Sequence, residues 1–454
     1  MLVLLAGTHL YFTIRLGFIQ RKLPDGLRRS LSSAGSGGLS PYEALSTALA
    51  ATIGTGNIIG ISSAIAIGGP GAVFWCWISG FFGMATCYAE SVLSAACRKK
   101  RADGSFYGGP MYVMEQLLHN RLLAVLFSVF TVLAALCVGS GVQAHSLTAV
   151  ISRRLPVSVH WIGIAAALLA GSILIGGAKK TAKVCTCLVP VMSVIYILMG
   201  IAMILVNIQR VPATIVEIFT NAFTGTAAIG GFAGCAVSEM IRVGMARSVY
   251  SNEAGWGTSP MIHASAKTRH PVEQGLWGSF EVFFDTFIIC SITALSVILS
   301  GNWTDGTNGG TLALSAFSSG FGTVGSLLLA VIMVVFTVTT SGGWFTYYLA
   351  ILEHLYKQEG IVKDIVMKLF YAVRALPGLL WTIYLVKTDN QGFIWTVVDI
   401  TSAIPTFVNV AVILLLSSQY FKLLKDYKAR YLGEGAVDPN MKLFYEEKVG
   451  KEEA

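Results

Sequence analysis

Long apolar stretches, separated by short polar loops, run from one end of the chain to the other. A helix needs about 20 residues to cross the hydrocarbon core of a bilayer, because each residue adds about 1.5 Å. By this measure the sequence predicts about eleven spans, at residues 1–19, 41–67, 70–97, 122–150, 159–177, 183–206, 213–249, 272–300, 321–355, 365–387 and 390–419. The stretches are continuously apolar and do not alternate, so an all-α polytopic membrane protein is favoured over a β-barrel.

Composition supports this fold class. Of 454 residues, 54% are hydrophobic and only 12% are charged, whereas soluble domains carry about 25% charged residues. The net charge of +8 could suggest a nucleic-acid partner in a soluble protein. Here the basic residues gather in alternate loops, where they face anionic lipid, so we expect the bilayer as partner and no nucleic acid.

The placement of Lys and Arg predicts the orientation. A basic run, Arg98–Arg101, follows the third span, and Lys422 and Lys425 follow the last one. The loop from Ser300 to Thr311 has no basic residue. Since basic loops stay on the cytoplasmic side, we expect the amino terminus outside and the carboxyl terminus inside. The expected location is the cytoplasmic (inner) membrane of a prokaryote.

Two spans contain glycine clusters at matched positions. The clusters lie at residues 51–57 in the second span and 230–234 in the seventh, five spans apart. Broken helices at such positions are typical of transporters with inverted repeats. The pattern predicts a five-plus-five inverted repeat with one extra N-terminal helix and two discontinuous helices; the alternative is a small-residue packing face. The predicted breaks are at Gly54, Gly56, Gly230, Gly231 and Gly234. The predicted units are 1–30 (extra helix and inner loop), 41–206 (first repeat), 213–420 (second repeat) and 421–454 (cytoplasmic tail).

A broken helix exposes N–H groups at one half-end and carbonyl groups at the other. The N–H end suits a carboxylate, and the carbonyl end suits a dehydrated cation such as sodium. Thr55 and Gly56 would offer N–H groups to the carboxylate of a small zwitterion. Thr52 and Asn57 add polar oxygens, although Asn57 could equally cap the helix at the break.

Few charged side chains fall within spans. Glu281 and Asp285 are four apart and share one helix face near mid-depth, so either is a candidate proton or cation site, or is neutralised by packing partners. Glu239 and Arg242 are three apart and predict a structural ion pair. Glu90, near the inner end of its span, is expected to reach the interface.

Several runs resemble one known family, the alanine or glycine:cation symporters (sodium:alanine symporters). The matching runs include Gly54-Thr55-Gly56-Asn57 and cover nearly the whole chain in order. They are Ala48–Ile58, Gly68–Ala72, Gly83–Thr86, Tyr107–Tyr112, Ser251–Gly255 and His270–Leu276. The resemblance implies a leucine-transporter-like fold and sodium-coupled, sometimes proton-coupled, uptake of alanine, glycine or a similar small amino acid by alternating access.

The resemblance also implies site residues. The substrate would be held by Thr55, Gly56, Gln143, Phe232, Ala236 and Trp344. One sodium ion would be held by the carbonyls of Ala50 and Ile53 with the hydroxyls of Thr339 and Thr340. Thr52 and Asn57 are candidates for a second ion. The chain reads Tyr347-Tyr348-Leu349 where the family usually has Tyr-Gly-Glu, which affects the expected substrate preference.

Other functions are disfavoured but define the alternatives. The chain has no GxSxG, HExxH or Walker motif, so we do not expect an enzyme or any cofactor except sodium as the coupling ion. The alternative closest to sodium symport is a proton-coupled amino-acid transporter of the same fold. An intramembrane enzyme, a channel or a non-transporting scaffold with this fold are further alternatives.

Overall fold

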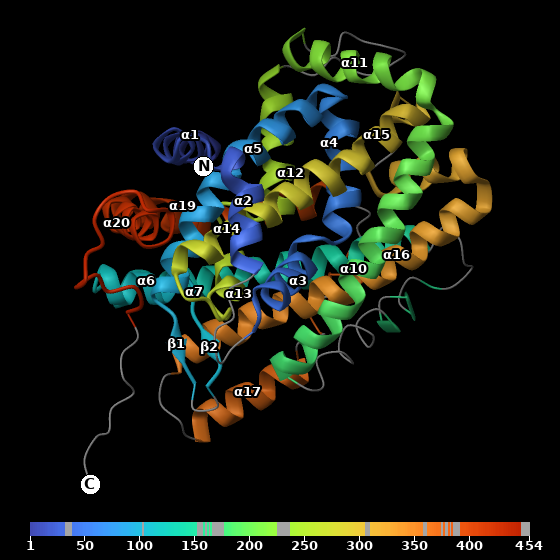
Figure 1. The fold of residues 1–454 in the computed structure, drawn as a ribbon. Coiled ribbons are helices and arrows are strands. Elements are labelled where there is room, and N and C mark those ends of the chain that lie inside the picture. Colours follow the sequence, from blue (N-terminus) through green and yellow to red (C-terminus); the bar gives the residue numbers. More distant parts are fainter. Residues whose placement is uncertain are drawn as a thin grey trace.

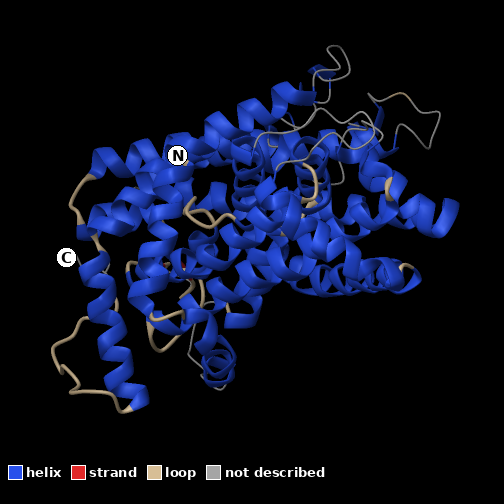
Figure 2. Ribbon diagram, turned by 90° about the horizontal axis from the view of Figure 1, so that it is seen from above, coloured by secondary structure: helices blue, strands red, loops and turns tan. Residues whose placement is uncertain are grey.

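The structure is a computed structural model that is built almost wholly of helices (Figures 1 and 2). It describes residues 1–31, 39–101, 104–151, 158, 161–162, 164–165, 177–224, 237–304, 309–356, 361–373, 376, 380–381, 383–384 and 391–445. Within these residues the strands are one antiparallel pair, β1 (Lys99–Lys100) and β2 (Phe106–Tyr107).

The helices follow one another with short connections. They are α1 (Leu2–Leu16), α2 (Leu23–Leu31), α3 (Pro41–Thr52), α4 (Ile61–Gly68), α5 (Gly71–Ala96), α6 (Pro110–Leu117), α7 (Arg121–Ala135), α8 (Gln143–Ile151), α10 (Gly177–Val206), α11 (Val211–Thr224), α12 (Val237–Asn252), α13 (Ser259–His263), α14 (Pro271–Phe283), α15 (Ser291–Ser300), α16 (Gly309–Leu355), α17 (Ile361–Val373), α19 (Gln391–Leu415) and α20 (Ser417–Tyr427). Turns of π-helix join some of them: η2 (Gly56–Gly60), η3 (Leu136–Val142), η5 (Phe284–Cys290) and η7 (Lys428–Leu432). Short 3-10 helices are η1 (Ile19–Lys22), η4 (Ile208–Arg210) and η6 (Asn302–Thr304).

The helices agree with the predicted class of membrane protein. Six helices in the described residues are long and apolar enough to span a bilayer, or up to eight if each bent pair is one span. The span predicted at 213–249 is two helices, α11 and α12, on either side of residues 225–236, which lie outside the described residues. Most of the span predicted at 159–177 also lies outside them. The span predicted at 321–355 extends back to Gly309, with a kink at Gly322.

The second predicted span is broken, as the glycine cluster indicated. Its first half, α3, begins with a capping box, because Ser40 and Glu43 bond each other's main-chain N–H groups. It ends at Thr52, and Ile53 is extended, with φ −80° and ψ 102°. The second half, η2 and α4, is bent from α3 by 50°. The first discontinuous helix is therefore confirmed.

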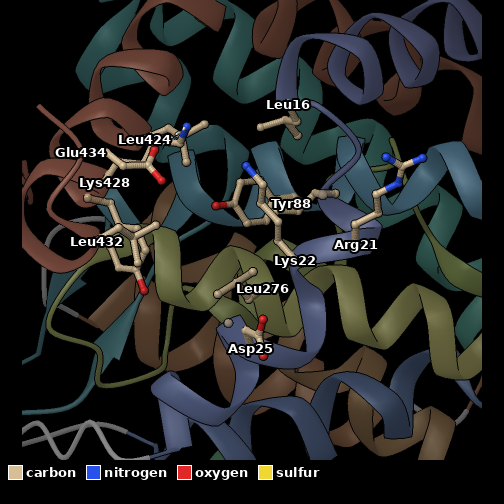
Figure 3. A pocket seen from close by; sticks show the side chains of 13 residues that line it. Leu16, Arg21, Lys22, Asp25, Tyr88, Leu276, Leu424, Lys428, Leu432 and Glu434 are labelled. Carbon is tan, nitrogen blue, oxygen red and sulfur yellow. Dashed lines mark ion pairs between the residues drawn. The ribbon is translucent and has the colours of Figure 1, made fainter.

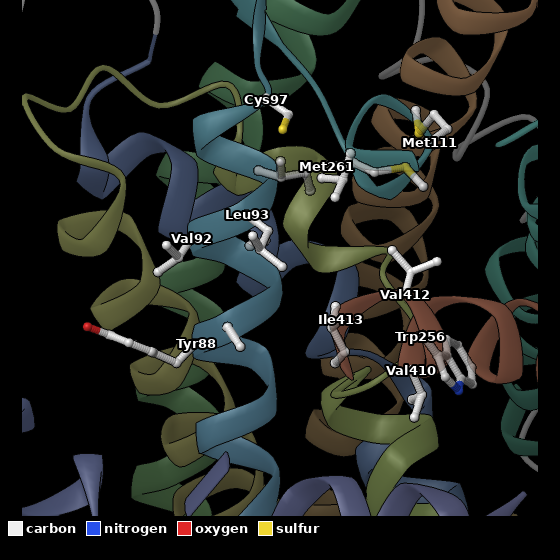
Figure 4. Packing of buried hydrophobic residues seen from close by; sticks show 14 of the residues in the cluster. Tyr88, Val92, Leu93, Cys97, Met111, Trp256, Met261, Val410, Val412 and Ile413 are labelled. Carbon is white, nitrogen blue, oxygen red and sulfur yellow. The ribbon is translucent and has the colours of Figure 1, made fainter. Parts of the chain in front are cut away.

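Helix α5 is a central scaffold for this break. Figure 4 shows Val92 and Leu93 of α5 within the buried cluster that also includes Ile413 of α19. Glycines allow α14 to pack closely on α5, since a Cβ at Gly275 would lie 2.6 Å from a methyl of Val92, and one at Gly278 would meet another α5 side chain. Small residues at helix contacts are typical of membrane proteins, where van der Waals packing holds helices together.

The start of α3 is attached to the loop between α13 and α14. The Leu39 N–H donates to the Ser265 carbonyl (3.2 Å), and the Lys267 N–H donates to the Leu39 carbonyl (2.7 Å). Arg98, just after α5, donates to the Ala266 carbonyl at 2.8 Å. The first half of the broken helix is thus connected to this loop through main-chain atoms, and the loop is connected to α5.

The C-terminal segment lies against the same region. The Arg98 guanidinium lies 3.9 Å from the ring centre of Phe106 and 4.0 Å from that of Phe444. The Tyr445 N–H donates to the Ala96 carbonyl at 2.7 Å. Figure 1 shows α20 (red) beside α1 (dark blue), and the two helices are in aromatic contact. The segment therefore contacts the end of α5 directly.

Candidate functional site

The break in the first discontinuous helix places Thr55 against Gln143, the first residue of α8. The Gln143 Oε1 atom accepts a hydrogen bond from the Thr55 hydroxyl at 2.7 Å and from its main-chain N–H at 3.3 Å. Both residues are buried. Two residues that the sequence assigned to substrate binding therefore lie together, and the Thr55 N–H predicted to bind a carboxylate here bonds an amide oxygen.

Gly56 lies against an aromatic ring. A Cβ atom at Gly56 would be 2.5 Å from Cε1 of Tyr250 on α12, so no larger residue fits without moving the ring. The hydroxyl of Tyr250 is buried and has no hydrogen-bond partner in the described structure. The ring makes edge contacts with Trp256 and Trp395. Sequence reasoning missed Tyr250, which had no signal beyond its place in the predicted inner half of the seventh span.

Trp344 is buried in α16 and closes the site from another direction. Its ring packs on the η3 backbone, since a Cβ at Gly139 would lie 2.7 Å from Trp344 Cγ. It also makes edge contacts with Trp256 and Tyr347, with ring centres 6.0 and 5.2 Å away. An aromatic wall follows from these contacts. The other predicted substrate contacts, Phe232 and Ala236, and the second break, at Gly230, Gly231 and Gly234, lie outside the described residues.

The expected sodium ligands from α3 and α16 are partly adjacent. The Thr340 hydroxyl donates to the Ile53 carbonyl at 3.1 Å, across the contact between the two helices. Thr339 instead donates to the Val335 carbonyl of its own helix at 3.0 Å. Ala50 is fully buried on the same side of the break. Ile53 and Thr340 thus place a carbonyl and a hydroxyl oxygen together, and both are ligands that sodium accepts.

A buried carboxylate lies at the other side of the break. Asn57 Oδ1 accepts from the Gly54 N–H at 2.8 Å, and its Nδ2 donates to Asp285 Oδ1 at 2.5 Å and to the Ser251 hydroxyl at 2.7 Å. Ser251 donates to Asp285 Oδ2 at 2.8 Å. Asn57 therefore caps the break and also contacts a carboxylate, and no lysine or arginine of the described chain pairs with Asp285.

Thr52 does not join this group. Its hydroxyl donates to the Ala48 carbonyl one turn earlier at 3.2 Å, which is a common local arrangement for Thr in a helix. Its predicted part in a second ion site stays a prediction. Asp285 was predicted only as a candidate proton or cation site, and its contact with Asn57 could not be read from the spacing of either residue.

Two interpretations of the intramembrane charges have different outcomes. The ion pair between Glu239 and Arg242 is confirmed. The expectation that Glu90 reaches the interface is wrong, because Glu90 is 1% exposed and accepts from Asn409 Nδ2 at 2.5 Å and from the Gly255 N–H at 3.3 Å. Position along a span alone cannot show that a neighbouring helix supplies donors for a carboxylate.

A separate pocket lies away from the break (Figure 3). It has a volume of about 220 Å³ and lies between the end of α1, α2 and the region of α20 and η7. Arg21, Lys22 and Lys428 line it with Asp25 and Glu434, and Lys428 pairs with Glu434 at 3.3 Å. None of the predicted substrate or sodium ligands lines this pocket, so it is not the predicted site.

The sequence matches the model of the sodium:alanine symporter family over residues 1–441. Among similar proteins, an uncharacterized transporter of Haemophilus influenzae is 38% identical over 95% of this chain and 93% of its own. The sodium/alanine symporter AgcS of Methanococcus maripaludis is 35% identical over 92% of this chain and 91% of its own. The probable sodium/glutamine symporter GlnT of Bacillus subtilis is 34% identical, over 94% and 87% respectively.

Solved transporters share the fold. A Na⁺-coupled sialic acid symporter in a substrate-bound outward-open state aligns with a TM-score of 0.58 and 12% identity, over 93% of this chain and 92% of its own. MhsT in complex with L-phenylalanine aligns with a TM-score of 0.57 and 11% identity, over 86% and 93% respectively. These likenesses confirm the leucine-transporter-like, all-α membrane fold. Together with the family match, they show that this chain is a multi-pass transporter of sodium-coupled amino-acid type and belongs to the sodium:alanine symporter family.

Proposed function

We propose that the protein uses inward sodium flux to take up a small neutral amino acid, alanine or glycine, by alternating access. The observation that carries this proposal is the break at Ile53–Asn57, where one carbonyl meets a hydroxyl of α16 and one N–H meets an exchangeable amide oxygen. A main-chain carbonyl that faces one way and an N–H that faces another can serve a cation and a carboxylate side by side.

The substrate carboxylate would bind the N–H groups of Thr55 and Gly56. In the described arrangement Gln143 Oε1 accepts from Thr55, so substrate binding would exchange this bond for one to the carboxylate and leave Gln143 beside the substrate. Tyr250 and Trp344 restrict the space around the break, which supports alanine, glycine or serine over leucine. Phe232 and Ala236 remain proposed pocket residues on family resemblance.

Sodium would bind at two places. The first is formed by the carbonyls of Ala50 and Ile53 with the hydroxyls of Thr340 and Thr339; Thr339 would have to turn away from its own helix. The proximity of Thr340 to Ile53 supports this site.

The second is formed by Thr52 and Asn57, now with Asp285 beside them. The donor-satisfied, unpaired carboxylate of Asp285 supports a cation there, since a buried anion without a counter-charge is costly. The same chemistry would also accept a proton, so the coupling ion is part of the test.

Transport would proceed as one bundle, containing both broken helices, rocks against the other helices. The amino terminus would face outward and the tail inward, and residues 41–206 and 213–420 would form the two inverted halves. Sodium at the break would favour the substrate-competent state. Because coupling is reciprocal, alanine must raise sodium affinity by the same factor as sodium raises alanine affinity.

Uptake into proteoliposomes tests the proposal. We expect labelled alanine to accumulate under an inward sodium gradient and not under an equal potassium gradient. Competition with unlabelled glycine, serine, glutamine and leucine measures the substrate class. Equal uptake under potassium would remove sodium coupling, and stronger competition by leucine than by alanine would remove the small-substrate proposal. A proton gradient without sodium distinguishes the proton-coupled alternative.

A further inference from the structure

A buried histidine and glutamate form a pair that the transport site does not use. His263, at the end of α13, places Nε2 2.8 Å from Oε2 of Glu281 on α14, and both side chains are 0% exposed. The Ser259 hydroxyl donates to the same oxygen at 2.5 Å. The other oxygen of Glu281, Oε1, is buried and has no hydrogen-bond partner. The pair thus has an unused acceptor in a site closed to solvent.

The groups around Glu281 are acidic. Five titratable side chains interact electrostatically with it, from α5, the α12–α13 linker, η5 and α16: Cys87, Glu90, Glu253, Asp285 and Tyr347. Among the described residues, the ion-pair partner of Glu281 is His263, and no lysine or arginine pairs with it. The surroundings therefore oppose a net negative charge on the pair.

Counting protons shows what the pair needs. Gln274 Nε2 lies 2.6 Å from His263 Nδ1. If the amide donates to Nδ1, the proton of a neutral His263 is on Nε2 and points to an ionised Glu281, which gives the pair a charge of −1. A fully buried charge of this kind is expensive, and one added proton removes it, either on Glu281 or, with the Gln274 amide turned, on the imidazole.

The other buried carboxylates nearby differ from Glu281. Glu90 accepts from Asn409 and from a main-chain N–H, one on each oxygen. Glu253 accepts from the hydroxyls of Thr258 and Tyr347, and no imidazole bonds either carboxylate. Glu281 alone among these three carboxylates combines an imidazole with an unpartnered oxygen. The proton is therefore assigned to the pair.

We propose that His263 and Glu281 form a proton-binding site that loses its proton when sodium occupies the site beside Asp285. Glu281 and Asp285 are four residues apart on one helix, about 6 Å along its axis. A cation beside Asp285 cancels the negative potential that favours the proton on the pair, so sodium and the proton compete. The site rests on the proposed sodium site, and it gives this chain a proton step in addition to sodium binding.

Proton release on sodium binding tests the site. Purified protein in a weakly buffered solution with a pH indicator is titrated with sodium chloride, with choline chloride as the salt control. We expect release of a measurable fraction of one proton per sodium bound. The sodium Kd should rise towards lower pH, by at most about tenfold per pH unit. Sodium binding is measured in parallel with the radioactive ion.

Three variants separate the outcomes. Glu281→Gln should bind sodium without proton release and with a Kd that no longer follows pH, and His263→Gln should reduce the release in the same direction if Glu281→Gln fails to fold. Glu239→Gln, at the partly exposed ion pair with Arg242, should release protons as the parent does. Sodium that binds the parent without proton release, or equal release from Glu281→Gln, overturns this proposal alone. Failure of sodium to bind the folded parent overturns the proposed function as well.

Discussion

Thr340 of α16 donates its hydroxyl to the carbonyl of Ile53, at the point where the first broken helix leaves its regular path, with 3.1 Å between the two oxygens. Ile53 has lost its helical conformation there, so its carbonyl is available to a side chain or an ion. The contact joins the two elements that the proposed first sodium site requires.

Thr340→Val should therefore weaken sodium binding. Valine keeps the shape of threonine but removes the oxygen, and we expect the sodium Kd to rise at least about tenfold, which corresponds to about 1.4 kcal/mol. Thr337→Val on the same helix is the matched control, since the Thr337 hydroxyl is buried and has no partner. Sodium-dependence curves of alanine uptake measure both, and equal curves for the two variants would contradict the first sodium site.

Gly56→Ala should abolish alanine uptake. The added methyl would lie 2.5 Å from Cε1 of Tyr250, so either the ring or the break must move, and the larger Gly56→Leu should have the same effect. Gly60→Ala is the control four residues on, because the nearest atom to a Cβ there is 3.8 Å away. Uptake assays with detergent gel filtration check activity and folding. Normal uptake by Gly56→Ala would show that the backbone at position 56 is not part of the binding surface.

Two substitutions at Gln143 should separate folding from binding. Gln143→Leu leaves the buried Thr55 N–H and hydroxyl without their acceptor, so we expect a loss of about 1–3 kcal/mol of stability. Gln143→Glu keeps an acceptor and strengthens it by its charge, so the protein should stay stable but bind alanine more weakly. Thermal unfolding and alanine titration measure the two effects. Tighter alanine binding by Gln143→Glu would mean that the substrate ammonium, and not its carboxylate, lies there.

His270 should make the protein less stable in acid. It precedes the spanning helix α14, and burial lowers the pKa of His270 to about 4 from its usual 6.5, although Asp426 opposes this shift. The unfolded chain therefore takes up a proton that the folded protein rejects. The free energy of unfolding should fall as pH drops from about 6.5 towards 4, by on the order of 3 kcal/mol in total.

Thermal unfolding between pH 7.5 and 4.5 measures this effect. The comparison is His270→Asn, which cannot titrate and keeps an acceptor for the Val272 N–H at the helix start. This variant should show a smaller loss of stability over the same range. An identical pH dependence in both proteins would assign the acid sensitivity to other groups.

Much of the fold could be predicted because lipid permits few backbone arrangements. The apolar stretches gave most span limits to within a few residues, and the glycine cluster at 51–57 predicted a break that the structure has. The long stretch at 213–249 could not be divided into α11 and α12, since apolar residues continue across the division. A hydropathy pattern records burial in lipid and does not record where a helix ends.

The site was predictable only where residues lie near in sequence or match the family. The pairing of Thr55 with Gln143 brings together residues 88 positions apart, and only the resemblance had placed both in one site. Asp285 beside Asn57, and Tyr250 over Gly56, depend on how separate helices pack. Nothing in the local spacing of these residues encodes that packing.

The attachment of Leu39 to Ser265 and Lys267 has an evolutionary consequence. Because both hydrogen bonds run between backbone groups, their strength does not depend on which side chains occupy these positions. The three residues can vary among related sequences while the connection persists, so alignment would not reveal it. Proline is the exception, since at position 39 or 267 it would delete a donor.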